Sequence, residues 1–141
     1  MYLMDTNVIS ETRIRRGHPI NPNVNAWAGS VADDETFVSS VTLFEIERGV
    51  IQAERRDARK GATLRSWFEE VVLETYEGRV LDFDAAAASA CARFQNVRTL
   101  PVQDGMIAAI AAANRLTLVT RNTRDFTGLG VPLLNPWTCA P

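Results

Sequence analysis

Short apolar runs alternate with longer helical stretches along the chain, and this alternation limits the possible fold more than any other feature. The apolar runs cover residues 2–4, 36–39, 79–83, 100–103, 116–120 and 131–135. Helical periodicity covers residues 41–56, 63–76, 85–97 and 105–115. Strands that alternate with helices predict an α/β domain. We expect a three-layer α/β/α sandwich with a central, mostly parallel sheet, formed by residues 1–141 as a single domain.

Two of the expected helices have an apolar face, which predicts that they pack against the sheet. The apolar positions in these two helices are Val41, Phe44, Val50, Ile51, Leu64, Trp67, Phe68, Val71 and Val72. The charged segment ERRDARK between them predicts an exposed helix end and turn. The two later helices are rich in alanine, which suits close packing on a sheet. We expect Trp27, Trp67 and Trp137 to anchor a core or an interface.

The composition excludes several classes of function. A net charge of -2 and a pI near 5.4 do not predict a general nucleic-acid binder. His18 is the only histidine and lies in a loop-like segment, so a histidine-rich zinc site is excluded. Cys91 and Cys139 lie far apart in the sequence, and we expect free thiols. No apolar run approaches the length of a membrane span and no signal peptide is recognisable, so we expect a cytoplasmic protein.

Three acidic residues follow apolar runs or lie near helix starts: Asp5, Glu45 and Asp104. Each has an ordinary structural interpretation when it is taken alone. Asp5 and Asp104 suit the N-cap position of a helix. Glu45 suits a capping box with Thr42, three residues before it.

The joint placement of the three acids favours chemistry over capping. All three are expected at one edge of a parallel sheet, where ligands bind. Carboxylates that converge in a partly desolvated cleft repel one another and need a positive counter-charge. Mg²⁺ and Mn²⁺ prefer oxygen ligands and are held by a few carboxylates. The pattern therefore predicts a Mg²⁺ or Mn²⁺ site that hydrolyses phosphodiesters without histidine.

Three segments, MYLMDTNVIS, SSVTLFEIERGV and QDGMIAAIAAANRLTLVTRNTRDF, occur in this order and resemble the PIN-domain family of nucleases. The similarity is to the VapC toxins of VapBC-type toxin-antitoxin pairs and to FitB, and it extends to the closing VPLLNPW. It implies a PIN-like α/β/α fold and a Mg²⁺- or Mn²⁺-dependent endoribonuclease. On the matching positions it implies that Asp5, Glu45 and Asp104 are the catalytic, metal-binding carboxylates.

The sequence departs from the family pattern at one position. Some members carry an aspartate where this chain has Asn122, and asparagine retains an oxygen ligand without the charge. Asp125 is a second candidate for this fourth position. We expect three neutral side chains to orient the carboxylates rather than bind metal themselves. These three are Thr6, Asn7 and Thr120.

The resemblance also implies partners. The first is a cognate VapB-like antitoxin, which inhibits the toxin and makes the contacts with operator DNA. The others are an RNA substrate and a second copy of the chain in a homodimer. The helical pair at 41–56 and 63–76, with Trp67 and Phe68, is our predicted antitoxin surface, although a core-facing stripe would give the same pattern.

Two groups of arginines are candidates for contact with the RNA backbone. Arg121 and Arg124 flank the last motif and are expected to hold phosphates. Arg13, Arg15 and Arg16 follow the first motif and suit either phosphate contact or a solvated loop.

Other functions fit the pattern less well. A haloacid-dehalogenase-like phosphatase needs a second aspartate where this chain has Asn7, and a receiver domain needs a lysine after its last strand. A PIN-like module that binds RNA or a partner without cutting is the alternative of a different class, and Asn122 favours it.

Overall fold

The computed structural model describes residues 1–139, and in this part of the chain five short strands form one sheet. The strands are β1 (Tyr2–Met4), β2 (Thr36–Ser39), β3 (Val80–Leu81), β4 (Thr117–Val119) and β5 (Leu133–Leu134). Their order is β3-β2-β1-β4-β5, and every neighbouring pair is parallel. The predicted parallel sheet is confirmed, with β1 at its centre.

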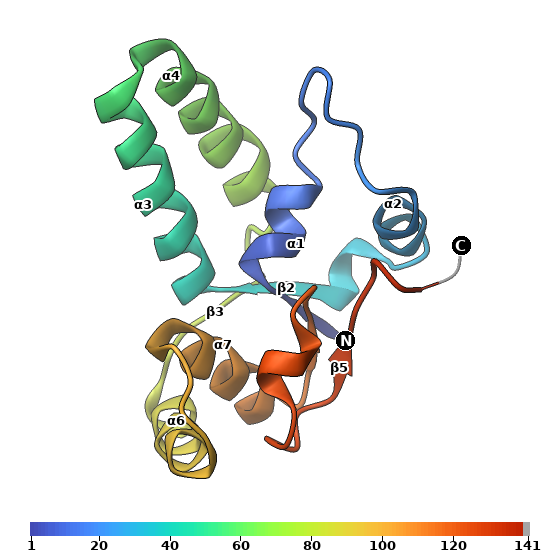
Figure 1. Cartoon of the computed structure of the whole chain (residues 1–141), viewed down its shortest axis with the longest axis vertical. Helices are drawn as coiled ribbons and strands as arrows, with labels where there is room; N and C mark the ends of the chain where they lie inside the picture. The colour runs from blue at the N-terminus through green and yellow to red at the C-terminus, as the bar shows by residue number, and fades with distance from the viewer. Residues whose placement is uncertain (140–141) are drawn as a thin grey trace.

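Helices cover both faces of the sheet. They are α1 (Thr6–Glu11), α2 (Pro22–Gly29), α3 (Ser40–Arg56), α4 (Ala58–Trp67), α5 (Leu73–Thr75), α6 (Ala85–Val97) and α7 (Val102–Ala113). The 3-10 helices η1 (Asp33–Glu35) and η3 (Thr123–Phe126) and the π-helical turn η2 (Phe68–Val72) complete the helical segments of the described residues. Helices α6 and α7 pack on one face, and α1, α3 and α4 lie on the other (Figure 1). The predicted three-layer α/β/α sandwich is confirmed.

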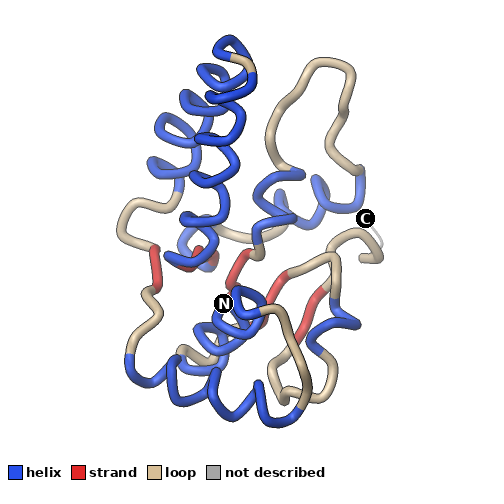
Figure 2. The backbone as a smooth tube through the Cα atoms, turned by 60° about the vertical axis from the view of Figure 1, so that its left-hand side comes forward, coloured by secondary structure: helices blue, strands red, loops and turns tan. Residues whose placement is uncertain are grey.

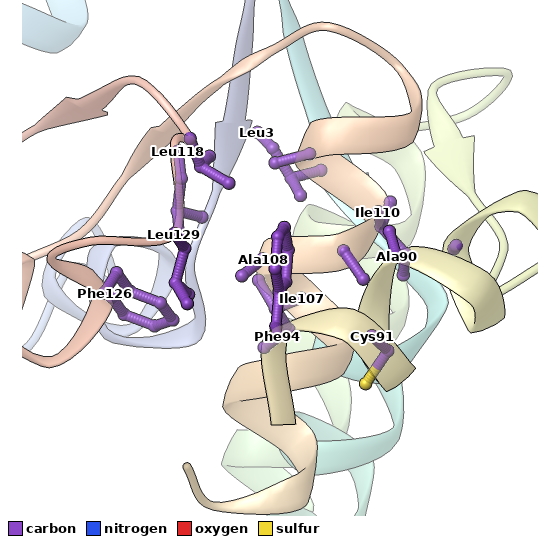
Figure 3. Packing of buried hydrophobic residues seen from close by; sticks show 14 of the residues in the cluster. Leu3, Ala90, Cys91, Phe94, Ile107, Ala108, Ile110, Leu118, Phe126 and Leu129 are labelled. Carbon is purple, nitrogen blue, oxygen red and sulfur yellow. The ribbon is translucent and has the colours of Figure 1, made fainter. Parts of the chain in front are cut away.

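Side chains alternate across the sheet and divide the core in two. Leu3 and Leu118 join the apolar cluster beneath α6 and α7, where they approach Ile107 (Figure 3). The next residue on each strand, Met4 and Val119, joins the cluster on the α1 and α3 face. This alternation follows from the two-residue repeat of a strand. Both faces of the central strands are therefore buried, as a parallel sheet requires.

The expected helix boundaries were right for α6 and nearly right for α3, but the second amphipathic helix differs. Asp57 separates α3 from α4, and its side chain accepts hydrogen bonds from the backbone N–H groups of Arg59 and Lys60. Helix α4 therefore begins at Ala58, before the expected residue 63, and passes into the π-helical turn and α5. The prediction of an exposed turn in ERRDARK is confirmed.

Three residues expected on the packed faces are exposed. Phe44 is 53% exposed, Ile51 40% and Val71 51%. Their helices bury other positions instead, including Ile46 on α3 and Val72 in the π-helical turn. At Val71 the π-helical turn is the cause, because it widens the helix locally and shifts the apolar stripe out of the 3.6-residue repeat that the prediction assumed.

One expected strand is absent and one helix was not expected. Residues 100–103 do not form a strand, because Pro101 lacks an N–H and instead occupies the N-cap of α7. Helix α2 begins at Pro22 after Asn21, whose side chain accepts from the N–H groups of Asn23 and Val24. Asparagine followed by proline is a known helix-start pattern, so the sequence contained this signal.

Three smaller predictions concern single residues. His18 is exposed and lies in a loop, as expected. Cys91 and Cys139 are free thiols, also as expected. In the described part of the chain, no helix has the length and apolar character needed to cross a membrane.

Candidate active site at the carboxyl edge of the sheet

The carboxyl ends of the three central strands meet at one edge of the sheet. Met4 of β1 is paired with Val38 of β2 and with Val119 of β4. The residues that follow these strands therefore lie side by side. Strands β2 and β3 lie on one side of β1, and β4 and β5 lie on the other, so the strand order reverses at β1. Ligands bind at such a reversal in open α/β sheets.

Asp5 is held at this edge by hydrogen bonds to both of its carboxylate oxygens. Oδ1 accepts from the backbone N–H of Thr6 at 2.7 Å. Oδ2 accepts from the hydroxyl of Thr120 at 2.8 Å and from the amide of Asn7 at 3.3 Å. Asp5 is only 6% exposed and is also the N-cap of α1. The structural interpretation of Asp5 is thus correct, and the same contacts fix the direction of its carboxylate.

Glu45 reaches the same place from α3. Its Oε1 accepts from the hydroxyl of Thr6 at 2.9 Å, directly beside Asp5. The expected capping box with Thr42 is wrong, because Ser39 is the N-cap and accepts from the N–H of Thr42 at 3.0 Å. The carboxylate of Glu45 is therefore not used to cap its own helix.

Asp104 lies in the first turn of α7 and not at its N-cap, which is Pro101. The pKa of Asp104 is raised to about 6, first by burial and then by the negative charges of Asp5, Glu45 and Asp125. Burial also raises the pKa of Asp5, with a further contribution from Glu45, although the hydrogen bonds from Thr120 and Thr6 oppose this. The three predicted acids therefore lie close enough to repel one another.

In the described part of the chain, no basic side chain forms an ion pair with this cluster. None of the ion pairs formed within residues 1–139 involves Asp5, Glu45 or Asp104. In the same residues, no three His, Cys, Asp or Glu side chains are arranged so that they hold a metal ion as they stand. A hard cation that retains most of its waters needs only one or two carboxylates, so the oxygen donors of this cluster fit Mg²⁺ or Mn²⁺.

The segment after β4 is tied to the start of α1. The Thr120 hydroxyl accepts from the N–H of Asn122 at 3.1 Å, and Asn7 Oδ1 accepts from the N–H of Arg121 at 3.2 Å. Asn122 itself is exposed and precedes η3, whereas the charge of Asp125 acts on Asp104. Of the two candidates for a fourth position, Asp125 is the one that adds negative charge at the cluster.

The two arginines of the last motif differ in their surroundings. The guanidinium of Arg121 lies over the ring of Trp137, 5.3 Å from its centroid. Arg124 is exposed on η3, and its carbonyl oxygen accepts from Arg98 at 3.3 Å. Of these two side chains, only that of Arg121 is stacked on an aromatic ring.

Thr42 is the site residue that sequence reasoning missed. It is fully buried, and its hydroxyl is hydrogen-bonded to the hydroxyl of Thr6 at 3.2 Å. Thr42 therefore supports the side chain that bonds Glu45. The sequence offered Thr42 only as a helix cap, and the correct cap, Ser39, lies three residues earlier.

Comparison with known proteins agrees with this geometry. The PIN domain family matches residues 2–130. Toxin FitB of Neisseria gonorrhoeae is 34% identical, and the match covers 97% of this chain and 99% of FitB. The VapC ribonuclease Y4jK of Sinorhizobium fredii is 30% identical, and the match covers 97% of this chain and 98% of Y4jK. The solved structure of FitAB bound to an IR36 DNA fragment superimposes with a TM-score of 0.86 and 31% identity, covering 100% of this chain and 99% of that one. These matches exclude the phosphatase and receiver-domain alternatives. The chain belongs to the PIN-domain family, as a member of its VapC and FitB group.

Proposed function

We propose that this protein is a metal-dependent endoribonuclease and the toxin of a toxin-antitoxin pair. The observation that carries the proposal is the convergence of Asp5, Glu45 and Asp104, none of which forms an ion pair within residues 1–139. The relatives named toxin and ribonuclease support the class of activity. Cleavage would occur at an RNA phosphodiester brought to the carboxyl edge of the sheet.

Asp5, Glu45 and Asp104 are the residues that would hold Mg²⁺ or Mn²⁺, one or two of them directly and the others through waters that the ion retains. The bound cation would supply Lewis-acid stabilisation of the negative charge that develops on the phosphate. Thr120 and Asn7 keep the carboxylate of Asp5 in one orientation, and Thr6 does the same for Glu45. Such contacts behind a metal ligand tune its affinity for the ion.

Residues around the cluster would bind the RNA and adjust the charge. Asp125 contributes negative charge to the site in place of an aspartate at Asn122. Arg121 and Arg124 follow β4 beside the cluster and would contact phosphates of the RNA backbone. Because Arg121 is stacked on Trp137, its guanidinium is ordered before RNA binds.

A VapB-like antitoxin is the proposed inhibitor. The FitAB structure bound to an IR36 DNA fragment supports a complex in which a second protein accompanies the toxin at DNA. The mildly acidic pI of about 5.4 agrees with DNA contacts made by the antitoxin rather than by this chain. We also retain the prediction of a homodimer.

Cleavage of a labelled pool of tRNA and messenger RNA by the antitoxin-free protein tests the proposal. The reaction is run with Mn²⁺, with Mg²⁺ and with EDTA, and the variants are Asp104→Asn and Asp34→Asn. Asp34 is an exposed acid in η1, away from the cluster, and serves as the matched control. We expect cutting that needs the metal, is lost in Asp104→Asn and persists in Asp34→Asn. No cutting with either metal by folded protein would contradict the proposal and favour a non-catalytic RNA-binding module.

A further inference from the structure

A second charged feature lies at the opposite end of α1 from the acidic cluster. The loop between α1 and α2 rises beside the α3–α4 pair (Figures 1 and 2). Between this loop and α4 is a groove of about 770 Å³. Its charged rim consists of Arg13, Arg15, Arg16, Arg59, Lys60 and Asp57. We call this feature the basic groove.

The basic groove concentrates positive charge in a chain whose net charge is negative. Five arginine or lysine side chains line it against a single carboxylate, whereas the whole chain carries a net charge of -2. The cations come from two separate segments, the loop after α1 and the start of α4. Such a patch is therefore not the solvated face of one helix, and it creates a local field that attracts an anion.

Part of the groove is ordered in advance. The guanidinium of Arg13 lies over the ring of Trp67, 5.6 Å from its centroid. Burial and the nearby positive charge of Arg15 lower the pKa of Arg13. The fold therefore holds these two guanidinium groups close together although they repel each other. An anion bound in the groove would relieve this repulsion.

Helix α1 connects the groove to the acidic cluster. Asp5 caps the first turn of α1, and Arg13 follows the last turn. Six helical residues at 1.5 Å each span about 9 Å, which is roughly the length of two to three stacked nucleotides at ~3.4 Å each. A strand whose phosphodiester lies at Asp5 therefore reaches the groove within a few nucleotides.

We propose that the basic groove binds the sugar-phosphate backbone of the RNA on one side of the cleaved bond. This inference rests on the proposed ribonuclease function and extends it to a second contact region. Arginine predominates over lysine in the groove, and its planar fork matches phosphate oxygens. Arg13 covers one face of Trp67, so the groove favours charge over base stacking. The groove thus strengthens RNA binding without reading sequence.

Binding of RNA to the Asp104→Asn protein tests this proposal without any need for cleavage. The probes are fluorescently labelled single-stranded RNAs of about 20 nucleotides and of about two nucleotides, the shorter one too short to reach the groove from Asp5, and the readout is anisotropy between about 50 and 200 mM salt. The test variant adds Arg15→Gln and Arg59→Gln. The matched control instead adds Arg93→Gln and Arg115→Gln, two exposed arginines on α6 and in the turn after α7.

We expect the groove variant to bind the long RNA about tenfold more weakly, with a shallower salt dependence, because two phosphate contacts are lost. Affinity for the short RNA, and the affinities of the matched control, are expected to stay unchanged. Equal loss in the control, or no loss in the groove variant, would overturn the proposal. Loss of antitoxin binding with unchanged RNA binding would also overturn it and assign the groove to a protein partner.

The test separates this proposal from the ribonuclease proposal. If wild-type protein cuts no RNA but the groove variant alone loses affinity, the nuclease proposal fails, and the groove stands as an RNA-binding surface with no cleaved bond beside it. If wild-type protein cuts RNA and the groove variant binds it normally, the nuclease stands and the groove fails.

Discussion

The carboxylate of Asp104 carries a free-energy penalty that a titration can detect. Its pKa in the folded protein is about 6, above the ordinary value of 3.8. Between these two pH values the folded state binds more protons than the unfolded state, so stability falls as the pH rises through this range. Above about pH 6 the penalty is complete.

Replacing Asp104 with asparagine is expected to remove this penalty. In EDTA at about pH 8, Asp104→Asn should raise the free energy of unfolding by about 1–2 kcal/mol, a range reduced for the partial exposure of the side chain. At about pH 2.5 the two proteins should be nearly equal, because Asp104 is then protonated in both states. Urea denaturation at the two pH values checks this, and a variant that is less stable at pH 8 would contradict the repulsion described above.

Thr120 supports Asp5 through a buried hydrogen bond of 2.8 Å. Thr120→Val retains the side-chain volume but removes the hydroxyl. A hydrogen bond to a charged group contributes about 1.5–3 kcal/mol, so we expect a loss of that size in urea denaturation at about pH 8. Thr127→Val, at an exposed position, is the control and should change stability by less than about 0.5 kcal/mol. Equal changes in the free energy of unfolding for the two variants would show that the hydrogen bond from Thr120 to Asp5 does not stabilise the fold.

Two glycines in the α3–α4 pair have opposite roles. A Cβ added at Gly61 of α4 would lie 2.7 Å from the backbone nitrogen of Glu54 on α3, whereas one added at Gly49 would meet nothing within 4 Å. Gly61→Ala is therefore expected to destabilise the protein by about 1–3 kcal/mol through overpacking. Gly49→Ala should stabilise it by about 0.5–1 kcal/mol, because alanine favours a helix. Thermal unfolding of both variants measures this contrast, and a neutral Gly61→Ala would mean that the helices do not approach so closely.

The sequence predicted the sheet well because strand residues follow a simple repeat. Residues 2–4 and 36–39 were located without error. Prediction failed where one residue changed the outcome. Pro101 converted an apolar run into a helix start, and the π-helical turn at Phe68–Val72 disturbed the helical repeat.

The candidate site was predictable from the sequence only in part. The proximity of Asp5, Glu45 and Asp104 was predictable because each lies just after a strand or near a helix start, and a parallel sheet brings such positions to one edge. The contacts that orient them were not predictable in detail. The bonds from Thr6 to Glu45 and from Thr120 to Asp5 span 39 and 115 residues of sequence, and they depend on the strand register.

The surface of the molecule has an exposed apolar area beside the acidic cluster. Phe44 is 53% exposed and Val102 is 60% exposed, and both line a pocket of about 370 Å³ between α3 and α7. Exposed apolar area of this kind suits contact with a second copy of the chain. We propose that this area is the contact of the predicted homodimer.

Phe44→Glu is expected to convert a dimer into a monomer, because a charge would be buried in the contact. Ile51→Glu is the matched control, since Ile51 lies on the same helix, is 40% exposed and does not line the pocket. Sedimentation velocity of the antitoxin-free protein gives the oligomeric state. Dimerisation that survives Phe44→Glu but is lost in Ile51→Glu would place the contact elsewhere on α3.

The central claim is that Asp5, which follows β1, and side chains of α3 and α7 form one site for a hard cation. Titration with Mn²⁺, followed by electron paramagnetic resonance of the free ion, tests it most directly in wild-type, Asp5→Asn, Asp104→Asn and Asp34→Asn proteins. We expect saturable Mn²⁺ binding in wild-type and Asp34→Asn proteins, and binding at least about tenfold weaker when Asp5 or Asp104 is neutralised. Absence of binding in the folded wild-type protein, or equal binding in all four proteins, would contradict the claim.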